Sequence, residues 1–515
     1  MVPAALLAVA YLLAAPSSAD LAAQTFRSDL FSSHGFLLWN DFWYGGHYLP
    51  GYSVLFPPLG AAIGPRAVGA LSAVAAAALF AALARRAYGA RAGLAVLWFG
   101  AGTATMLFTG RLTFALGVAV GAGALLALQR RRLATAVLLA ALTSCASPVA
   151  GLFVALAGVA VAFAGDRRGG AAIAAGAVGA AALLSLAFPT GGVEPFAFSA
   201  LVPVLLVAAA GLILLPPEEA TLRWAIAVYA IASIVAFAIP NPVGGNMARL
   251  GALAAGPALA LGLTGRRPVA LAVLALPLLY WQWVAPVRDL AAASGDPSVR
   301  AGYYAPLLGE LSRRTGGAPV RVEIPPTRNR WEATYVAPRF SLARGWLRQL
   351  ESDDFDLFTN GNLTATAYRD WLYARGVSYV AVSDAEPDYL SRDEEALIAT
   401  GPSYLKPLWS DPHWRLYRVL GSPGLLSDAS RPARPSRGAR LTGLGPADFT
   451  VAASRPEELL VRLHYTPYWS VASGSACVER DGEWTRITVE QPGSTRVAAR
   501  FSLSGLLGRD RRCSE

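Results

Sequence analysis

Long apolar runs separated by short polar turns fill the first 286 residues of the chain. A helix needs roughly 17–25 mostly apolar residues to cross a bilayer. About eleven runs approach or reach this length, at residues 2–16, 66–84, 91–109, 112–129, 133–146, 149–165, 169–188, 197–215, 223–239, 249–264 and 268–286. The pattern predicts a polytopic α-helical membrane domain over residues 1–286, with a partial or re-entrant helix at 52–64.

Arginine clusters occur at every second turn between these runs. They are Arg85-Arg86, Arg130-Arg131-Arg132, Arg167-Arg168 and Arg266-Arg267. Short basic loops stay in the cytoplasm, so all four clusters are assigned to the inner side. The same assignment places residues 16–66, the 240–249 loop and everything after about Pro286 on the outer side.

Residues 16–66 form the one long segment between two predicted spans, and a long ordered loop is usually functional. Asp20 follows a Pro-Ser-Ser run as a helix N-cap would, and no Pro or Gly interrupts the chain from there to about Ser33. We therefore expect an amphipathic helix in the membrane interface, with the polar edge formed by Asp20, Gln24 and Arg27 in water. The aromatic residues that follow suit either a headgroup-level belt or a sugar-binding surface.

The composition changes sharply after residue 286, where a water-exposed domain of two parts is expected. Residues 287–424 carry helix-like runs at 341–352, 365–375 and 388–399 and strand-like runs at 320–324, 377–382 and 413–420, which predicts an α/β domain. A Pro-, Ser-, Arg- and Gly-rich linker follows at 425–440. Short alternating segments over 441–515 then predict a small β-sandwich.

Composition narrows the class of protein further. Hydrophobic residues make up 54% of the chain and charged residues only 15%, whereas soluble proteins carry about 25% charge. The net charge of +10 comes almost wholly from arginine. A nucleic-acid partner is not indicated, because the sequence has no basic stripe with regularly spaced aromatic residues. Three cysteines lack metal-ligand spacing, and Cys477 and Cys513 are placed to form a disulfide outside the cytoplasm.

Several polar residues gather on the predicted outer side. Arg111 stands between two apolar runs at membrane depth, where a charge needs a partner or a ligand. The 240–249 loop adds Asn246 and Arg249. Because arginine binds phosphate through two parallel hydrogen bonds, these residues are predicted to hold a lipid phosphate or diphosphate.

The run Gly-Phe-x-Leu-Trp-Asn-x-x-Trp-Tyr-Gly-Gly at residues 35–46 and the Phe-Pro-Pro at 56–58 support a resemblance. With a first span that ends before an aspartate and a long first outer loop, the chain resembles the polytopic membrane glycosyltransferases of the GT-C type. The later runs GVSYVAV and YTPYWSV are similar to outer domains of such proteins. The resemblance covers the whole layout of the chain.

This resemblance implies an enzyme of the bacterial plasma membrane that transfers a sugar from a polyprenyl-phosphate donor to an outer-face glycan or lipid. Asp20 matches the first-loop acidic residue that acts as base or metal ligand, which leaves a divalent metal open as a cofactor. Substrate contacts are expected from His47, Trp43, Tyr44 and Tyr52.

Two other functions compete with the enzyme. The paired acidic motif of many GT-C relatives is absent from this chain, which favours a non-catalytic assembly or scaffold protein. A lipid or solute transporter fits less well, because the spans lack repeats and carry almost no ionisable residue at their middle.

Overall fold

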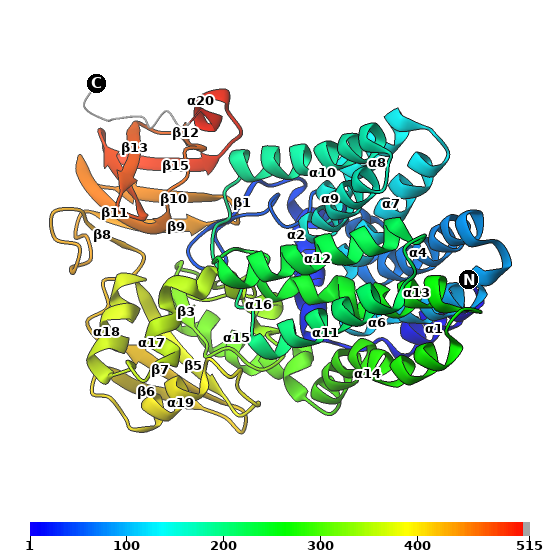
Figure 1. The fold of residues 1–515 in the computed structure, drawn as a ribbon. Coiled ribbons are helices and arrows are strands. Elements are labelled where there is room, and N and C mark those ends of the chain that lie inside the picture. The colour runs from blue at the N-terminus through cyan, green and yellow to red at the C-terminus, as the bar shows by residue number, and fades with distance from the viewer. Residues whose placement is uncertain (508–515) are drawn as a thin grey trace. The chain divides into compact units, whose positions relative to one another are not determined.

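The structure, a computed structural model, describes residues 1–507 (Figure 1). Helices dominate the first part of the chain and strands the last part. The chain divides into two compact units. Unit 1 comprises Met1–Gly35 and Pro50–Ser294, and unit 2 comprises Phe36–Leu49 and Gly295–Glu515. The short segment Phe36–Leu49, here called the inserted segment, thus belongs to the C-terminal unit.

Unit 1 is entirely helical in its regular structure, and each predicted apolar run is helical, although the run at 91–109 is divided between η1, α5 and α6. The helices are α1 (Val2–Ala14), α2 (Ala19–His34), α3 (Phe56–Ile63), α4 (Pro65–Tyr88), α5 (Gly93–Gly102), α6 (Ala104–Phe108), α7 (Leu112–Gln129), α8 (Leu133–Ala146), α9 (Pro148–Phe163), α10 (Arg167–Ala187), α11 (Phe198–Leu214), α12 (Ala220–Ala238), α13 (Ala248–Leu263) and α14 (Pro268–Ala293), with 3₁₀ turns η1 (Gly89–Ala92) and η2 (Gly244–Met247). Buried alanine, leucine and phenylalanine side chains pack them together.

Five helical stretches in residues 1–507 are long and apolar enough to cross a membrane, or up to six if α1 and α2, bent by 78°, form one broken span. One of the five, Pro65–Phe108, turns back on itself. The rings of Phe80 and Phe99 stack at 4.1 Å, whereas 19 residues of straight helix would separate them by about 28 Å. The long apolar helices are compatible with a membrane protein, and eleven crossings remain a prediction.

The expected helix after the first span is present as α2, but two details of the prediction were wrong. Ser18, not Asp20, is the N-cap, so Asp20 lies in the first helical turn. The polar edge does not face water either, because Gln24 and Arg27 are buried together with the apolar Phe26. Arg27 and Gln24 instead contact Tyr52, as described below. The expected partial helix is α3, with Pro57 and Pro58 in its first turn.

The first part of unit 2 contains a five-stranded sheet in the order β4-β3-β5-β7-β6. Its strands are β3 (Arg321–Glu323), β4 (Ser341–Leu342), β5 (Val377–Ser383), β6 (Leu405–Ser410) and β7 (Trp414–Val419). Strand β3 pairs in parallel with β4 and β5, and β7 pairs antiparallel with β5 and β6. The α/β pattern was therefore correct, and β6 was missed.

Helices of this part include α15 (Ala301–Thr315), η3 (Pro297–Val299), α16 (Glu332–Tyr335), η4 (Arg348–Asp354), α17 (Phe355–Thr359), α18 (Ala365–Ala374) and α19 (Arg392–Ala399). The helix predicted at 341–352 was wrong. Its first residues form β4, because Ser341 and Leu342 pair with β3, and only its end is helical, as η4. Buried Tyr368, Leu372 and Val380 anchor α18 to the sheet.

The last part of unit 2 holds two four-stranded antiparallel sheets, ordered β12-β15-β10-β9 and β13-β14-β11-β8. The strands are β8 (Leu426–Asp428), β9 (Ala439–Leu444), β10 (Asp448–Ala453), β11 (Glu457–His464), β12 (Trp469–Ser473), β13 (Ala476–Asp481), β14 (Trp484–Val489) and β15 (Gly493–Ala499), followed by the short helix α20 (Leu503–Leu506). Burial alternates along β10, as the predicted period-2 pattern requires. The stretch expected as a linker contains β8. Cys513, the predicted disulfide partner of Cys477, lies outside the described residues.

The inserted segment contributes backbone and side-chain bonds to the α/β part of unit 2. It contains the short strands β1 (Trp39–Asn40) and β2 (His47–Tyr48), which pair with each other. The Leu342 amide donates to the Phe42 carbonyl at 2.8 Å, and the buried Trp43 indole donates to the Ala333 carbonyl at 2.9 Å. Trp43 is fully buried. The segment therefore extends the β4 edge of the sheet.

The same segment also bonds to the β-rich part. The Asp41 amide donates to the Pro446 carbonyl at 2.6 Å, and the His464 amide donates to the Gly45 carbonyl at 2.6 Å. Gly45 has φ +83°, and a Cβ there would lie 2.8 Å from the buried Arg321 guanidinium. Only glycine fits this turn without displacing Arg321. The inserted segment thus joins both parts of unit 2.

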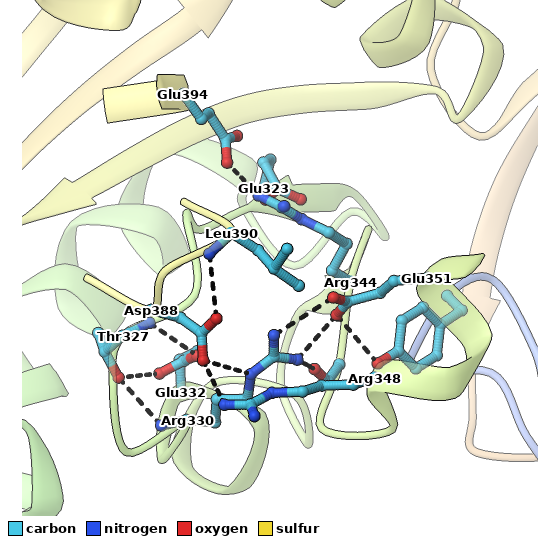
Figure 2. Close-up of polar contacts among 12 residues, drawn as sticks. Glu323, Thr327, Arg330, Glu332, Arg344, Arg348, Glu351, Asp388, Leu390 and Glu394 are labelled. Atoms are coloured by element: carbon cyan, nitrogen blue, oxygen red, sulfur yellow. Dashed lines mark hydrogen bonds and ion pairs between the residues drawn. The ribbon is translucent and has the colours of Figure 1, made fainter. Parts of the chain in front are cut away.

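A network of buried charges joins Glu323 of β3 to residues of the segments that follow it (Figure 2). Arg330 bonds Glu351 at 2.8 Å, and Arg344 bonds both Glu323 and Glu394. Burial raises the pKa of Glu323 and of Glu394 despite the adjacent Arg344. Burial alone would raise the pKa of Asp388, but the charges of Arg330 and Arg348 hold this pKa below its ordinary value. Buried arginines therefore share several carboxylates in place of water.

Replacement of Trp43 tests the role of the inserted segment. Trp43→Ala removes a fully buried indole and its hydrogen bond, so we expect unit 2 to lose about 3–5 kcal/mol of stability. Pulse proteolysis of the full-length protein across a urea series measures this loss through cleavage in 295–515. Phe36→Ala is the control, because Phe36 lies in the same segment and is 56% exposed. Equal urea midpoints for the two variants would contradict the assigned role.

Glu332 provides a pH test of the charge network. The carboxylate accepts bonds from the Thr327 amide at 3.2 Å and hydroxyl at 2.7 Å, and burial raises its pKa to about 7 from 4.5. Its contribution is complete below pH about 4.5 and is lost as the pH rises through about 7. We expect Glu332→Gln to remove about 3 kcal/mol of this pH dependence, measured by the same proteolysis at pH 5 and 8. The exposed Glu386→Gln should leave the dependence unchanged.

Candidate functional site

An ion pair in unit 1 joins two residues that the sequence singled out. Arg111 Nε lies 3.2 Å from Asp20 Oδ2, and both side chains are about a quarter exposed, at 29% and 25%. The turn before α7 fixes this geometry. Gly110 has φ +77°, and a Cβ there would lie 2.4 Å from the Leu21 amide nitrogen. Close packing of this turn on the start of α2 therefore places Arg111 beside Asp20.

Arg249, in the first turn of α13, completes the cationic side of the site. It lies near enough to Asp20, Arg111 and Glu194 for their charges to act on it. Within residues 1–507 its guanidinium forms no salt bridge, although the residue is half-buried. A half-buried cation that makes no direct salt bridge is costly, and an anionic ligand in contact with it would relieve that cost.

Tyr52 lies beside this group and is held by two residues of α2. Gln24 Nε2 donates to the Tyr52 hydroxyl at 2.9 Å, and the Arg27 guanidinium lies 3.8 Å from the centre of the Tyr52 ring. Tyr52 is also close enough to Arg249 to interact with its charge. We call Asp20, Tyr52, Arg111 and Arg249 the polar cluster.

An apolar cavity of about 300 Å³ lies between the helices of unit 1. Eight helices line it, represented by Phe80 of α4, Phe99 of α5, Phe114 of α7, Phe153 of α9, Val204 of α11, Tyr229 of α12, Leu250 of α13 and Trp281 of α14. Its size is at the lower end of small-molecule pockets, about 300–1,000 Å³. Its lining is almost entirely hydrocarbon, which suits an apolar chain.

The cavity reaches the polar cluster through α7 and α13. Phe114 lines the cavity one helical turn beyond Arg111, and the Arg249 guanidinium lies 6.0 Å from the centre of its ring. Leu250 and Gly251, the residues directly after Arg249, also line the cavity. The Tyr229 hydroxyl fixes the start of α13, donating to the Met247 carbonyl at 2.8 Å and accepting from the Gly251 amide at 3.1 Å. Cationic groups thus adjoin a hydrocarbon-lined space.

The remaining predicted site residues are distributed differently. Asn246 lies in η2, two residues before the first residue of α13, and is half-buried. His47, Trp43 and Tyr44 belong to unit 2, where all three are buried. His47 stacks on Trp43 with ring centres 5.4 Å apart, and the Tyr44 hydroxyl donates to Glu351 at 3.4 Å. All three pack within unit 2 and are not members of the polar cluster, and their predicted contact with a substrate stays a prediction.

No family model matches the chain, and no curated protein matches it. The site must therefore be interpreted from its own chemistry. Among the side chains that the structure describes, no group of three or more His, Cys, Asp or Glu residues could hold a metal ion. The chemistry available in the polar cluster is that of guanidinium groups, one carboxylate and one phenol.

Sequence reasoning identified Asp20, Arg111 and Arg249 but did not assign Gln24, Arg27 or Glu194 to the site. The sequence did contain a signal for Gln24 and Arg27, because both lie on the same predicted helical face as Asp20. They were assigned to water because an interfacial helix normally exposes its polar face. Glu194 gave no such signal, since it lies in an irregular stretch between α10 and α11.

Filling the cavity tests whether it holds a lipid chain. Ala258→Phe places a ring at a lining position, so lipid bound to the purified full-length protein should fall several-fold, as measured by mass spectrometry of extracted lipid per protein. Ala171→Phe is the control, because Ala171 is exposed on α10 and does not line the cavity. Equal lipid retention in both variants would contradict a lipid-binding cavity.

Proposed function

We propose that this protein is a membrane glycosyltransferase that moves a sugar from a polyprenyl-phosphate donor to a cell-envelope glycan or lipid. The observation that carries the proposal is the position of Arg249 and Arg111 directly beside an apolar cavity. A polyprenyl phosphate has the matching two-part chemistry. Its hydrocarbon chain suits the cavity, and its phosphate suits guanidinium groups. The resemblance of residues 35–46 and 56–58 to GT-C enzymes points to the same class.

In this proposal the donor phosphate binds between Arg249 and Arg111 and takes the place of Asp20 as the partner of Arg111. The Asp20 carboxylate then accepts the proton of the acceptor hydroxyl. The acceptor oxygen forms a bond to the anomeric carbon while the bond from that carbon to the phosphate oxygen breaks. The electron pair of the broken bond leaves with the polyprenyl phosphate, whose new charge the two arginines stabilise.

A non-catalytic scaffold is the second candidate, and one observation favours it. Asp20 and Arg111 form an ion pair with each other, so neither side chain needs a substrate to be satisfied. A structural role for this pair would require only that it tie α2 to the start of α7. A transporter has no comparable support in the described residues, because the polar cluster adjoins a cavity with an almost wholly apolar lining.

Asp20→Asn separates the two candidates. Asp20 is not the helix cap, and an ion pair this exposed contributes about 1 kcal/mol or less, so the fold should persist. If Asp20 is the base, sugar transfer should fall by about 10²–10⁴-fold, measured as complementation of a deletion strain or by transfer from a radiolabelled polyprenyl-phosphate sugar. Asp29→Asn on the same helix is the control, because Asp29 is exposed. Transfer at the control rate would remove the catalytic assignment and favour the scaffold.

Arg249→Gln tests the phosphate contact independently of catalysis. A hydrogen bond to a charged group contributes about 1.5–3 kcal/mol, so the affinity for polyprenyl phosphate should fall by about 10- to 100-fold in a native mass spectrometry titration. Arg91→Gln is the matched control, because Arg91 is exposed in η1 and does not belong to the polar cluster. Unchanged affinity in Arg249→Gln would place the phosphate elsewhere.

The proposed location is the bacterial plasma membrane, with eleven spans and unit 2 outside the cytoplasm. All four arginine clusters lie at helix ends or in the turns between helices of unit 1, and all four are assigned to the cytoplasmic side. A reporter that is active only outside the cytoplasm should therefore be active when fused after Glu515. An active cytoplasmic reporter at the same position would overturn this topology and the outer-face acceptor with it.

A further inference from the structure

A short apolar strip ends the described part of unit 2. Phe501, Leu503 and Leu507 are 54%, 70% and 71% exposed, and Leu506 adds a fourth partly exposed apolar side chain. Four such residues within seven positions form a concentrated patch in a water-exposed domain. Soluble surfaces normally scatter their exposed apolar residues singly, and a contiguous patch marks an interaction site.

The strip is fixed in its outward-facing position. The Arg500 amide donates to the Tyr468 carbonyl at 2.9 Å, and the Phe501 ring stacks on Tyr468 with centres 5.8 Å apart. Ser502 caps α20 by accepting from the Gly505 amide at 3.0 Å. A Cβ on Gly505 would lie 2.8 Å from the Pro467 carbonyl, so α20 packs tightly there. The sheet therefore holds the backbone of the strip while its leucines remain exposed.

Positive charge adjoins the strip. Arg500 is exposed and forms no salt bridge within residues 1–507. Arg509, Arg511 and Arg512 follow in the sequence, with Asp510 as the one acid among them. Apolar side chains next to arginines are the combination that binds the interface of an anionic bilayer. The excess of arginine over acidic residues in residues 500–515 favours an anionic lipid surface as the partner.

The attachment of unit 2 to the helices favours the same partner. The chain passes between the two units at 35–36, 49–50 and 294–295. The last passage follows directly after α14, which is long and apolar enough to cross a membrane. A tethered surface meets the bilayer at a high effective concentration, so even a weak lipid contact is occupied. From these observations we propose that Phe501, Leu503, Leu506 and Leu507 form a lipid-docking strip that holds unit 2 on an anionic membrane surface.

Photo-crosslinking tests this strip in the full-length protein. Phe501→p-benzoylphenylalanine, placed in nanodiscs of phosphatidylcholine with one third phosphatidylglycerol, should form lipid adducts detectable by mass spectrometry. Thr442→p-benzoylphenylalanine is the control, because Thr442 is exposed on β9, at the opposite edge of the same sheet. We expect at least a five-fold higher lipid yield at position 501, and a lower yield in pure phosphatidylcholine.

A second pair of substitutions checks that the leucines cause the contact. Leu503→Ser with Leu507→Ser changes two exposed side chains, so the sheets should keep their fold, and the lipid yield at position 501 should fall several-fold. Equal yields at 501 and 442 would overturn the proposal. A crosslink from 501 to protein, either a second copy or the same chain, would overturn it as well. The proposal stands or falls independently of sugar transfer.

Discussion

The burial of the inserted segment in unit 2 is the constraint on which the rest of the chain depends. Phe36–Leu49 comes from the N-terminal part of the sequence but bonds to strands and loops that follow it by about 300 to 400 residues. Unit 2 is therefore complete only when the inserted segment has packed against it. Such long-range pairing carries a large loop-closure cost, which the fully buried Trp43 and its neighbours must offset.

Burial of this segment has an electrostatic consequence. Arg321 lies fully buried against Gly45, and its guanidinium donates to the Arg375 and Arg462 carbonyls at 2.6 and 2.7 Å. Burial lowers the pKa of Arg321 to about 9, with Arg375 adding to the effect. Nearby, burial raises the pKa of Asp41. The backbone carbonyls that solvate Arg321 are in place only when the α/β and β-rich parts meet, so this arginine reports on their association.

Local signals explain what the sequence could predict. Apolar runs determine where α7, α8 and α10 lie, because a helix in a bilayer satisfies its own backbone groups without help from distant residues. Alternation likewise indicated β10. The role of residues 36–49 could not be predicted this way, since their partners lie far along the chain and their aromatic content equally suits an interfacial belt. Strand β4 could not be predicted either, because it is only two residues long and is too short to show an alternating apolar and polar pattern.

The candidate site and the inserted segment share one stretch of chain. Helix α2, which carries Asp20, ends at His34, one residue before unit 1 gives way to unit 2. Tyr52 lies two residues after Pro50, where unit 1 resumes. The two flanks of the inserted segment thus carry two members of the polar cluster. Both flanks of the inserted segment therefore lead directly into unit 1, and the loop that completes unit 2 is continuous in sequence with the candidate site.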